Sequence, residues 1–285
     1  MFRRLKVVAA LALVFSLLST LLVQGTAWAQ LTAATEGPVV YGHHHLNVTS
    51  VDEHKKFWIG TLGGRQAKAR ADIVQFPNVF VFLRQQAPTG GTKGSLVNHI
   101  GFQVPDIRAM VNKLRAAGYP IITRDETTNP EKDGVALTPQ NTSIAFVMGP
   151  DNTKVEIVEN KAATQPVSLH HVHFFNPEFV AMRDWYAKTF AATPGRRGAF
   201  ETADLPGVTL SFATSPTPVV ATRGRSLDHV GFEVKDLENF CKRLEAQGIK
   251  LDRPYTKVPL GIAIAFIVDP WGTYIELTEG LSDLQ

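Results

Sequence analysis

Histidines in this sequence recur at places where strands are expected to begin. Eight of the nine histidines lie in or beside four short stretches, and only His54 falls elsewhere. Residues 98–104 read NHIGFQV and residues 228–234 read DHVGFEV, so His99 and His229 occupy the same place in two copies of one pattern. Imidazole groups bind divalent metals and exchange protons near neutral pH. This distribution indicates a repeated site for metal binding or acid–base chemistry.

Two further histidine-rich stretches precede these copies, HHHLNV from His43 and HVHFFN from His171. An aromatic pair begins fourteen residues after each of these two histidines, which places them at equivalent points of the pattern. Because side chains two residues apart share one face of a strand, both imidazoles should lie on the face opposite the helices. Their neighbours His44 and His170 should then point away and pack elsewhere.

A glutamate lies at a matching place near the end of each half of the chain. Glu156 stands in KVEIVE and Glu276 in YIELTE, each between two apolar residues. A carboxylate that alternates with apolar side chains on a strand is partly buried, and a buried carboxylate requires a partner. A metal ion would provide that partner.

Four similar units must position these residues, each predicted as a strand, a helix and about three further strands. We expect an α+β fold in which the four βαβββ modules pair into two cupped, mixed β-sheet domains. The predicted boundaries are residues 38–160 for the first domain, 161–166 for a linker, 167–280 for the second domain and 281–285 for a tail.

The N-terminus has the composition of an export signal. Residues 1–29 combine basic residues, an apolar run and a small-residue cleavage site, which predicts a Sec-type signal peptide followed by a leader at 30–37. An uncleaved anchor is the alternative, since the apolar run is just long enough to span a membrane. We expect a periplasmic or secreted protein without stable membrane insertion after cleavage. The net charge of +3, with no basic run beyond the N-terminus, argues against a nucleic-acid partner.

The repeated unit resembles the vicinal oxygen chelate superfamily of glyoxalases, extradiol dioxygenases and bleomycin resistance proteins. The resemblance covers residues 38–280, and its most specific parts are the histidine strands and the run FIVDPWGTYIEL from Phe266, with a looser copy, FVMGPDNTKVEI, from Phe146. It implies that two paired units form a cupped sheet with a metal inside.

The superfamily's metal ligands carry over to His43, His99 and Glu156 in the first half and to His171, His229 and Glu276 in the second. Pairing of units across the halves, for example His43 with His229 and Glu276, would give the same kind of ligand set. Two imidazoles and one carboxylate form the triad of non-haem iron(II) oxygenases, which leaves up to three positions for substrate oxygens and dioxygen. The resemblance therefore favours Fe²⁺, with Zn²⁺ or Mn²⁺ as alternatives.

The sequence departs from two families of this superfamily. Glyoxalase I takes a fourth ligand from the strand that corresponds to NVFVFLR or VTLSFA, where this chain offers only phenylalanine, threonine or serine. Extradiol dioxygenases have a tyrosine where this chain has Phe266. They also have a histidine shortly before that tyrosine, whereas this chain has no histidine between His229 and Glu276. His173 and His45, each two residues beyond a predicted ligand, could replace the acid–base group. Candidate substrate contacts are Tyr274, Phe266, Glu233, Gln103 and Asn47.

These observations predict an exported metalloenzyme that binds a small substrate through neighbouring oxygens, most simply a dioxygenase. A glyoxalase-like lyase, isomerase or transferase is the second hypothesis, and a non-catalytic protein that holds a small ligand is the third. A homodimer is compatible with all three.

Overall fold

The structure is a computed structural model that describes residues 31–34, 37 and 39–284. The predicted signal peptide lies outside these residues, as do parts of the predicted leader and the last residue of the tail. Among the described residues, no helix has the length and apolar character needed to cross a membrane.

Each predicted unit is present as a strand, a helix and further strands. The first unit contains β1 (Val39–Val48), α1 (Val51–Lys55), the π-helix η1 (Lys56–Thr61), β2 (Arg65–Gln66), β3 (Ile73–Phe76) and β4 (Val79–Gln85). The second contains β5 (Val97–Val104), α2 (Ile107–Ala116), α3 (Thr123–Glu126), β6 (Ala136–Leu137), β7 (Ser143–Met148), the short 3₁₀ helix η2 (Pro150–Asn152) and β8 (Lys154–Glu159).

The second half of the chain repeats this order. The third unit contains β9 (Ser168–Phe175), α4 (Phe179–Phe190), β10 (Thr193–Arg197), β11 (Phe200–Leu205) and β12 (Val208–Ala213). The fourth contains β13 (Leu227–Val234), α5 (Leu237–Ala246), β14 (Leu251–Lys257), β15 (Ala263–Val268), β16 (Tyr274–Glu279) and the 3₁₀ helix η3 (Leu281–Leu284). The strands β10 and β14 each contain a proline. Both lie at a sheet edge, where a missing N–H can be tolerated.

The units pair across the two halves of the chain. One eight-stranded sheet, here called the terminal sheet, joins the first and fourth units in the order β14-β15-β16-β13-β1-β4-β3-β2. The other, the central sheet, joins the second and third units in the order β10-β11-β12-β9-β5-β8-β7-β6. Of the two pairings that the sequence left open, the structure therefore shows the one across the halves, and the predicted boundaries of two sequential domains do not hold. Residues 161–166, predicted to separate two domains, connect β8 to β9 inside the central sheet.

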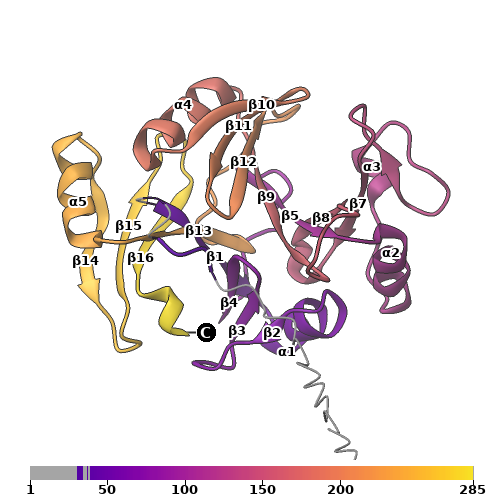
Figure 1. The fold of residues 1–285 in the computed structure, drawn as a ribbon, viewed down its shortest axis with the longest axis horizontal. Helices are drawn as coiled ribbons and strands as arrows, with labels where there is room; N and C mark the ends of the chain where they lie inside the picture. The colour runs from indigo at the N-terminus through magenta and orange to yellow at the C-terminus, as the bar shows by residue number, and fades with distance from the viewer. Residues whose placement is uncertain (1–30, 35–36, 38, 285) are drawn as a thin grey trace, which may run out of the picture.

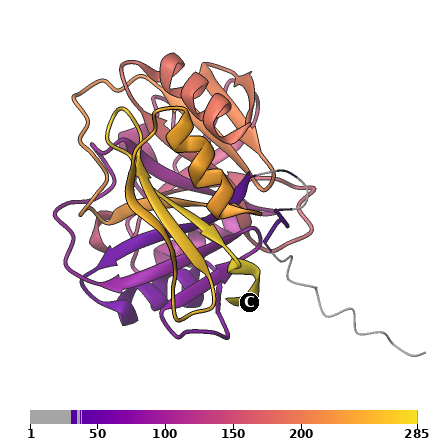
Figure 2. The ribbon, with the colours of Figure 1, turned by 90° about the vertical axis from the view of Figure 1, so that its left-hand side faces the viewer.

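The helix-facing sides of the two sheets share one apolar core. Trp58 of η1 lies 6.0 Å from Phe102 of β5, measured between ring centroids, so the first unit packs against the second. Phe190 of α4 stacks on Phe232 of β13 at 4.3 Å, so the third unit packs against the fourth. Figure 1 shows α5 and α2 at opposite sides of the molecule, and Figure 2 shows α5 lying along the strands of the fourth unit. Both cups therefore keep their histidine faces clear of this core.

Candidate metal centres

Each sheet gathers three histidines and one glutamate in its cup. The terminal cluster consists of His43, His45, His229 and Glu276, and the central cluster consists of His99, Glu156, His171 and His173. In each cluster one possible donor atom from every residue lies within 4.8 Å of the others. The six residues predicted as ligands are thus brought together, but in sets that span both halves of the chain.

A glycine between the donors allows them to meet. On the terminal sheet, Gly231 lies opposite His43 on one neighbouring strand and opposite Glu276 on the other. A Cβ atom at Gly231 would stand 2.0 Å from Cε1 of His43. On the central sheet, a Cβ at Gly101 would stand 2.1 Å from Cε1 of His171. The glycine of the repeated histidine pattern is required because the imidazole from the neighbouring strand lies directly over it.

Bulges in the ladders add a polar residue behind several of the histidines. The pairing of β1 with β13 skips Asp228, and the pairing of β5 with β9 skips Asn98 and His170. A bulge lets two consecutive side chains reach the same region. His170 consequently meets His171, with 2.8 Å between their Nδ1 atoms, so the expectation that it points away is wrong. His44 does point away, and its Nδ1 lies 2.7 Å from the hydroxyl of Tyr41.

In the terminal cluster, two imidazoles converge on one carboxylate oxygen. Nε2 of His43 lies 2.9 Å, and Nε2 of His229 2.8 Å, from Oε2 of Glu276. Burial opposes ionisation of Glu276, but His43 and His229 hold the pKa of this carboxyl below its usual value. Burial also lowers the pKa of His43. The pKa of His229 is raised, because hydrogen bonds to Asp228 and Glu276 outweigh its burial.

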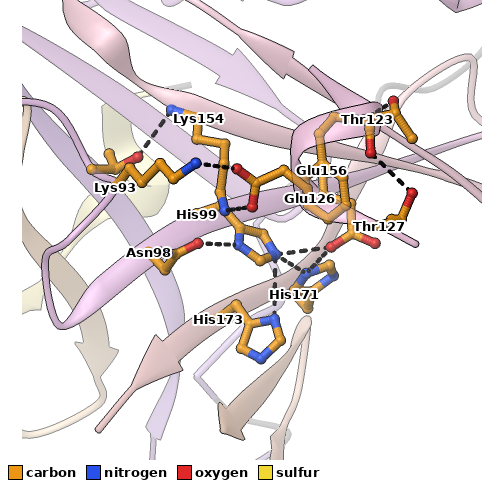
Figure 3. Close-up of polar contacts among 12 residues, drawn as sticks. Lys93, Asn98, His99, Thr123, Glu126, Thr127, Lys154, Glu156, His171 and His173 are labelled. Carbon is orange, nitrogen blue, oxygen red and sulfur yellow. Dashed lines mark hydrogen bonds and ion pairs between the residues drawn. The ribbon is translucent and has the colours of Figure 1, made fainter. Parts of the chain in front are cut away.

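The central cluster repeats this geometry (Figure 3). Nε2 of His99 lies 2.8 Å, and Nε2 of His171 3.2 Å, from Oε2 of Glu156. The same Nε2 of His99 lies 3.3 Å both from Nε2 of His171 and from Nδ1 of His173. Burial lowers the pKa of His99 to about 4. Despite its burial, Glu156 has a pKa held well below the usual value by His171 and His99.

Both donor sets fit a divalent metal. Several imidazole nitrogens and a carboxylate oxygen converge on one point, and at most one proton can lie between any two of these atoms. Nδ1 of His43, Nε2 of His45 and Nε2 of His173 are buried and have no hydrogen-bond partner among the described residues. A Zn²⁺ or Fe²⁺ ion accepts imidazole and carboxylate donors together.

The two clusters differ in the residue behind the equivalent histidine. Asp228 accepts from Nδ1 of His229 at 2.7 Å, whereas the neutral side chain of Asn98 occupies this place beside His99 at 2.9 Å. Burial opposes ionisation of Asp228, but its contacts with His229 lower the pKa of the carboxyl to about 2. A carboxylate behind a ligating imidazole raises the basicity of that ligand. Asp228 and Asn98 were not among the predicted site residues, although a polar residue precedes both histidines in the repeated pattern.

The linings of the two cups also differ. A cavity of about 290 Å³ opens beside the central cluster, and Glu156, His171 and His173 form part of its wall. The rest of this wall combines polar side chains with apolar ones: Thr138, Gln140, Thr142, His170, Arg197 and Ser211 are polar, and Ile144, Val158 and Phe200 are apolar. The terminal cup is lined by a second apolar cluster, which includes Phe80, Ile264, Phe266, Tyr274 and, from η3, Leu281 and Leu284.

The predicted substrate contacts take several places. Phe266 and Tyr274 stack on each other at 4.9 Å beside His229, so they do lie in the terminal cup. Glu233 instead accepts hydrogen bonds from the Thr278 hydroxyl and from two backbone N–H groups that lead into η3.

Two amides among the predicted contacts lie in hydrogen-bonded networks. Gln103 donates to Ser168 and accepts from Asn160, which ties β5 to the segments around the β8–β9 connection. Asn47 donates to Asp228 and thus belongs to the network behind His229.

Comparisons with known proteins agree with this architecture. A model of the family described as "Glyoxalase/Bleomycin resistance protein/Dioxygenase superfamily" matches residues 131–277. The crystal structure of glyoxalase I from Zea mays superposes with a TM-score of 0.63 and 16% identity over 86% of this chain and 94% of that one. A Bacillus subtilis structure named "putative dioxygenase" gives 0.62 and 14% over 84% of each chain. At these identities the likeness shows the fold alone.

A curated relative matches a shorter stretch. The Vibrio cholerae serotype O1 protein named "Probable lactoylglutathione lyase" is 39% identical over 71 residues, which is 25% of this chain. The matched stretch spans 45% of that relative's length.

Proposed function

Because this chain belongs to the glyoxalase/bleomycin resistance protein/dioxygenase superfamily, we propose that it is a metal-dependent enzyme whose substrate binds in the central cup through neighbouring oxygen atoms. The observation that carries this proposal is the cavity of about 290 Å³, which borders Glu156, His171 and His173. A pocket of this size suits a small molecule. A divalent metal would supply Lewis acidity that polarises the substrate oxygens.

The wall of the cavity provides groups that could orient such a substrate. Hydroxyl and amide groups of Thr138, Gln140 and Thr142 offer hydrogen bonds on one side. Arg197, whose Nη2 donates to Thr209 at 3.3 Å, places a positive charge in the same wall. Phe200 meets the edge of His173 with 4.7 Å between ring centroids. Together with the apolar side chains of Ile144 and Val158, this combination favours a small, oxygen-rich anion that also has an apolar part.

The location can be tested with two matched variants, because Glu156 and Glu276 are equivalent in the two sheets. We expect two metal ions per wild-type chain, and one in each of Glu156→Gln and Glu276→Gln, measured by elemental analysis after removal of loosely bound metal. Oxalate, a small dianion with neighbouring oxygens, should bind to metal-loaded wild type and to Glu276→Gln in calorimetry, but not to Glu156→Gln. Oxalate binding that is lost in Glu276→Gln and kept in Glu156→Gln would place the substrate in the other cup. A wild-type protein with no metal would overturn the proposal.

Turnover separates the possible reaction classes. If His99, His171 and Glu156 were the only protein donors, three positions of an octahedral ion would remain, which is enough for two substrate oxygens and dioxygen. Metal-loaded protein should therefore be assayed with 1,2-dicarbonyl, 2-hydroxycarbonyl and ortho-dihydroxy compounds in air and under nitrogen. Turnover only in air identifies an oxygenase, and turnover under both conditions identifies a lyase or isomerase. Tight binding of these compounds with no turnover would contradict the enzymatic part of the proposal.

A further inference from the structure

In each cluster a third histidine lies beside the two histidines and the glutamate that were predicted as ligands. In the central cup, Nδ1 of His173 lies 3.3 Å from Nε2 of His99 (Figure 3). In the terminal cup, the ring of His45 lies 4.4 Å from that of His229, measured between centroids. We propose that His173 and His45 are fourth metal ligands, so that each centre consists of three histidines and one glutamate. This inference rests on the proposed metal-dependent function and concerns the number of donors.

Strand geometry places the additional histidine in the same way in both cups. His173 lies two residues beyond His171 on β9 and directly opposite His99 in the ladder. His45 has the same relation to His43 on β1 and to His229 on β13. The two cups share this arrangement although different side chains line them. A feature that is common to both cups and independent of their lining belongs to the donor set rather than to a substrate pocket.

The distances agree with a single ion in each cluster. Imidazole nitrogens and carboxylate oxygens bind a divalent metal such as Zn²⁺ at about 2.0–2.2 Å, so two donors on one ion are at most about 4.4 Å apart. The four possible donor atoms of each cluster already lie within 4.8 Å of one another. Movements of a few tenths of an ångström would bring all four onto one ion.

The strand beside each of these histidines offers no metal donor at the paired position. Here Ser211 of β12 pairs with His173, and Phe82 of β4 pairs with His45. Neither serine nor phenylalanine replaces an imidazole or carboxylate donor. The histidine beside each of these residues supplies a donor one strand away.

The packing of His173 suits a fixed ligand. Its ring meets the edges of Phe175 at 4.9 Å and of Phe200 at 4.7 Å, measured between centroids. These contacts hold Nδ1 towards the cluster, and the residue is 4% exposed. A general base would have to present a free nitrogen to the substrate. Nδ1 is directed at the other donors, and Nε2, although it has no partner among the described residues, is buried.

The donor count bears on the reaction. An octahedral ion with four protein donors has two remaining positions, and two neighbouring substrate oxygens would fill both. No position is then left for dioxygen while the substrate is bound. A four-donor centre therefore favours a lyase, isomerase or transferase over a dioxygenase.

The test uses Glu276→Gln as the background, so that only the central centre binds metal. His173→Ala in this background should weaken Zn²⁺ binding by at least about tenfold in competition with a chelator, since even the loss of a residue that only supports a ligand costs about 10–100-fold. X-ray absorption should count three imidazoles on zinc before the substitution and two after it. Ser211→Ala, which changes the residue paired with His173 in the same cavity, should leave both values unchanged.

Nitric oxide provides a second readout as a probe of the dioxygen position. With Fe²⁺ and oxalate bound, the background protein should give no iron–nitrosyl signal in electron paramagnetic resonance, and His173→Ala should give one. Unchanged zinc affinity and imidazole count in His173→Ala, or a nitrosyl signal in the background protein, would overturn the inference while the metal-dependent function stands. Failure of the background protein to bind any metal would instead overturn the proposed function.

Discussion

Replacing Gly101 by alanine tests whether the repeated glycine makes room for a metal ligand. The new Cβ would lie 2.1 Å from Cε1 and 2.3 Å from Nδ1 of His171. Carbon atoms in contact prefer about 3.5–4.0 Å, so the imidazole must retreat by roughly 1.5 Å. Metal–ligand distances tolerate only about 0.2 Å. The central centre should therefore lose its metal, whereas the terminal centre should keep it.

The stability cost should be moderate. Overpacking of this kind costs about 1–3 kcal/mol, which corresponds to a melting temperature lower by several degrees for a protein of this size. Gly231→Ala should have the mirrored effect and empty only the terminal centre, because its Cβ would lie 2.0 Å from Cε1 of His43.

Elemental analysis gives the number of metal ions bound by each variant, and thermal unfolding gives its melting temperature. Gly60→Ala is the matched control, because a Cβ there meets no atom within 4 Å. It should keep both metals and unfold within a degree or two of wild type. If Gly101→Ala also retained both metals with unchanged affinity, the glycine would not be what allows the donors to meet, and the geometric argument would be wrong.

Two further predictions concern residues around the donors. Asp228→Asn should weaken metal binding in the terminal centre by about 10–100-fold, and Asn98→Asp should strengthen it in the central centre, as measured by chelator competition; equal affinities before and after both changes would contradict this. Burial lowers the pKa of His44 to about 3, against about 6.5 in the unfolded chain. The unfolded state then takes up the proton first, so this residue reduces stability as pH falls from about 6.5 towards 3. Metal-free His44→Gln should lose less stability than metal-free wild type between pH 7 and pH 5 in urea titrations, and parallel losses would show that another group is responsible.

The sequence was sufficient to predict the units and most of the residues that meet in the two clusters. Alternation along their strands predicted that His229 and Glu276 each face the cup, and in the structure Nε2 of His229 lies 2.8 Å from Oε2 of Glu276. The helix predicted after the first strand of each unit is present, and in α2 the side chain of Asp106 accepts a hydrogen bond from the N–H of Ala109. These features depend on residues close together in the chain, where local geometry determines which side chains share a face.

The pairing of units could not be predicted in the same way. All four units present similar strands, so the pattern alone allows β1 to pair with β5 or with β13. The choice depends on tertiary packing, such as the stacking of Phe190 on Phe232. Bulges were missed because the extra residue in one strand is visible only when both strands are compared. For this reason Asp228 and His170 were not recognised as neighbours of the donors.

A chain that folds from its N-terminal end can complete its two sheets only in a fixed order. The central sheet uses strands between residues 97 and 213, a continuous part of the chain. The terminal sheet joins β1 to β13, and its donors His43 and Glu276 are 233 residues apart. Until β13 is available, one edge of β1 is unpaired and could pair with a wrong strand. Because β1 and β13 are far apart in the sequence, the contact between them should also form slowly. The terminal cluster can therefore assemble only after β16 is in place, and a metal ion bound there would mark a chain in which β1 and β16 have met.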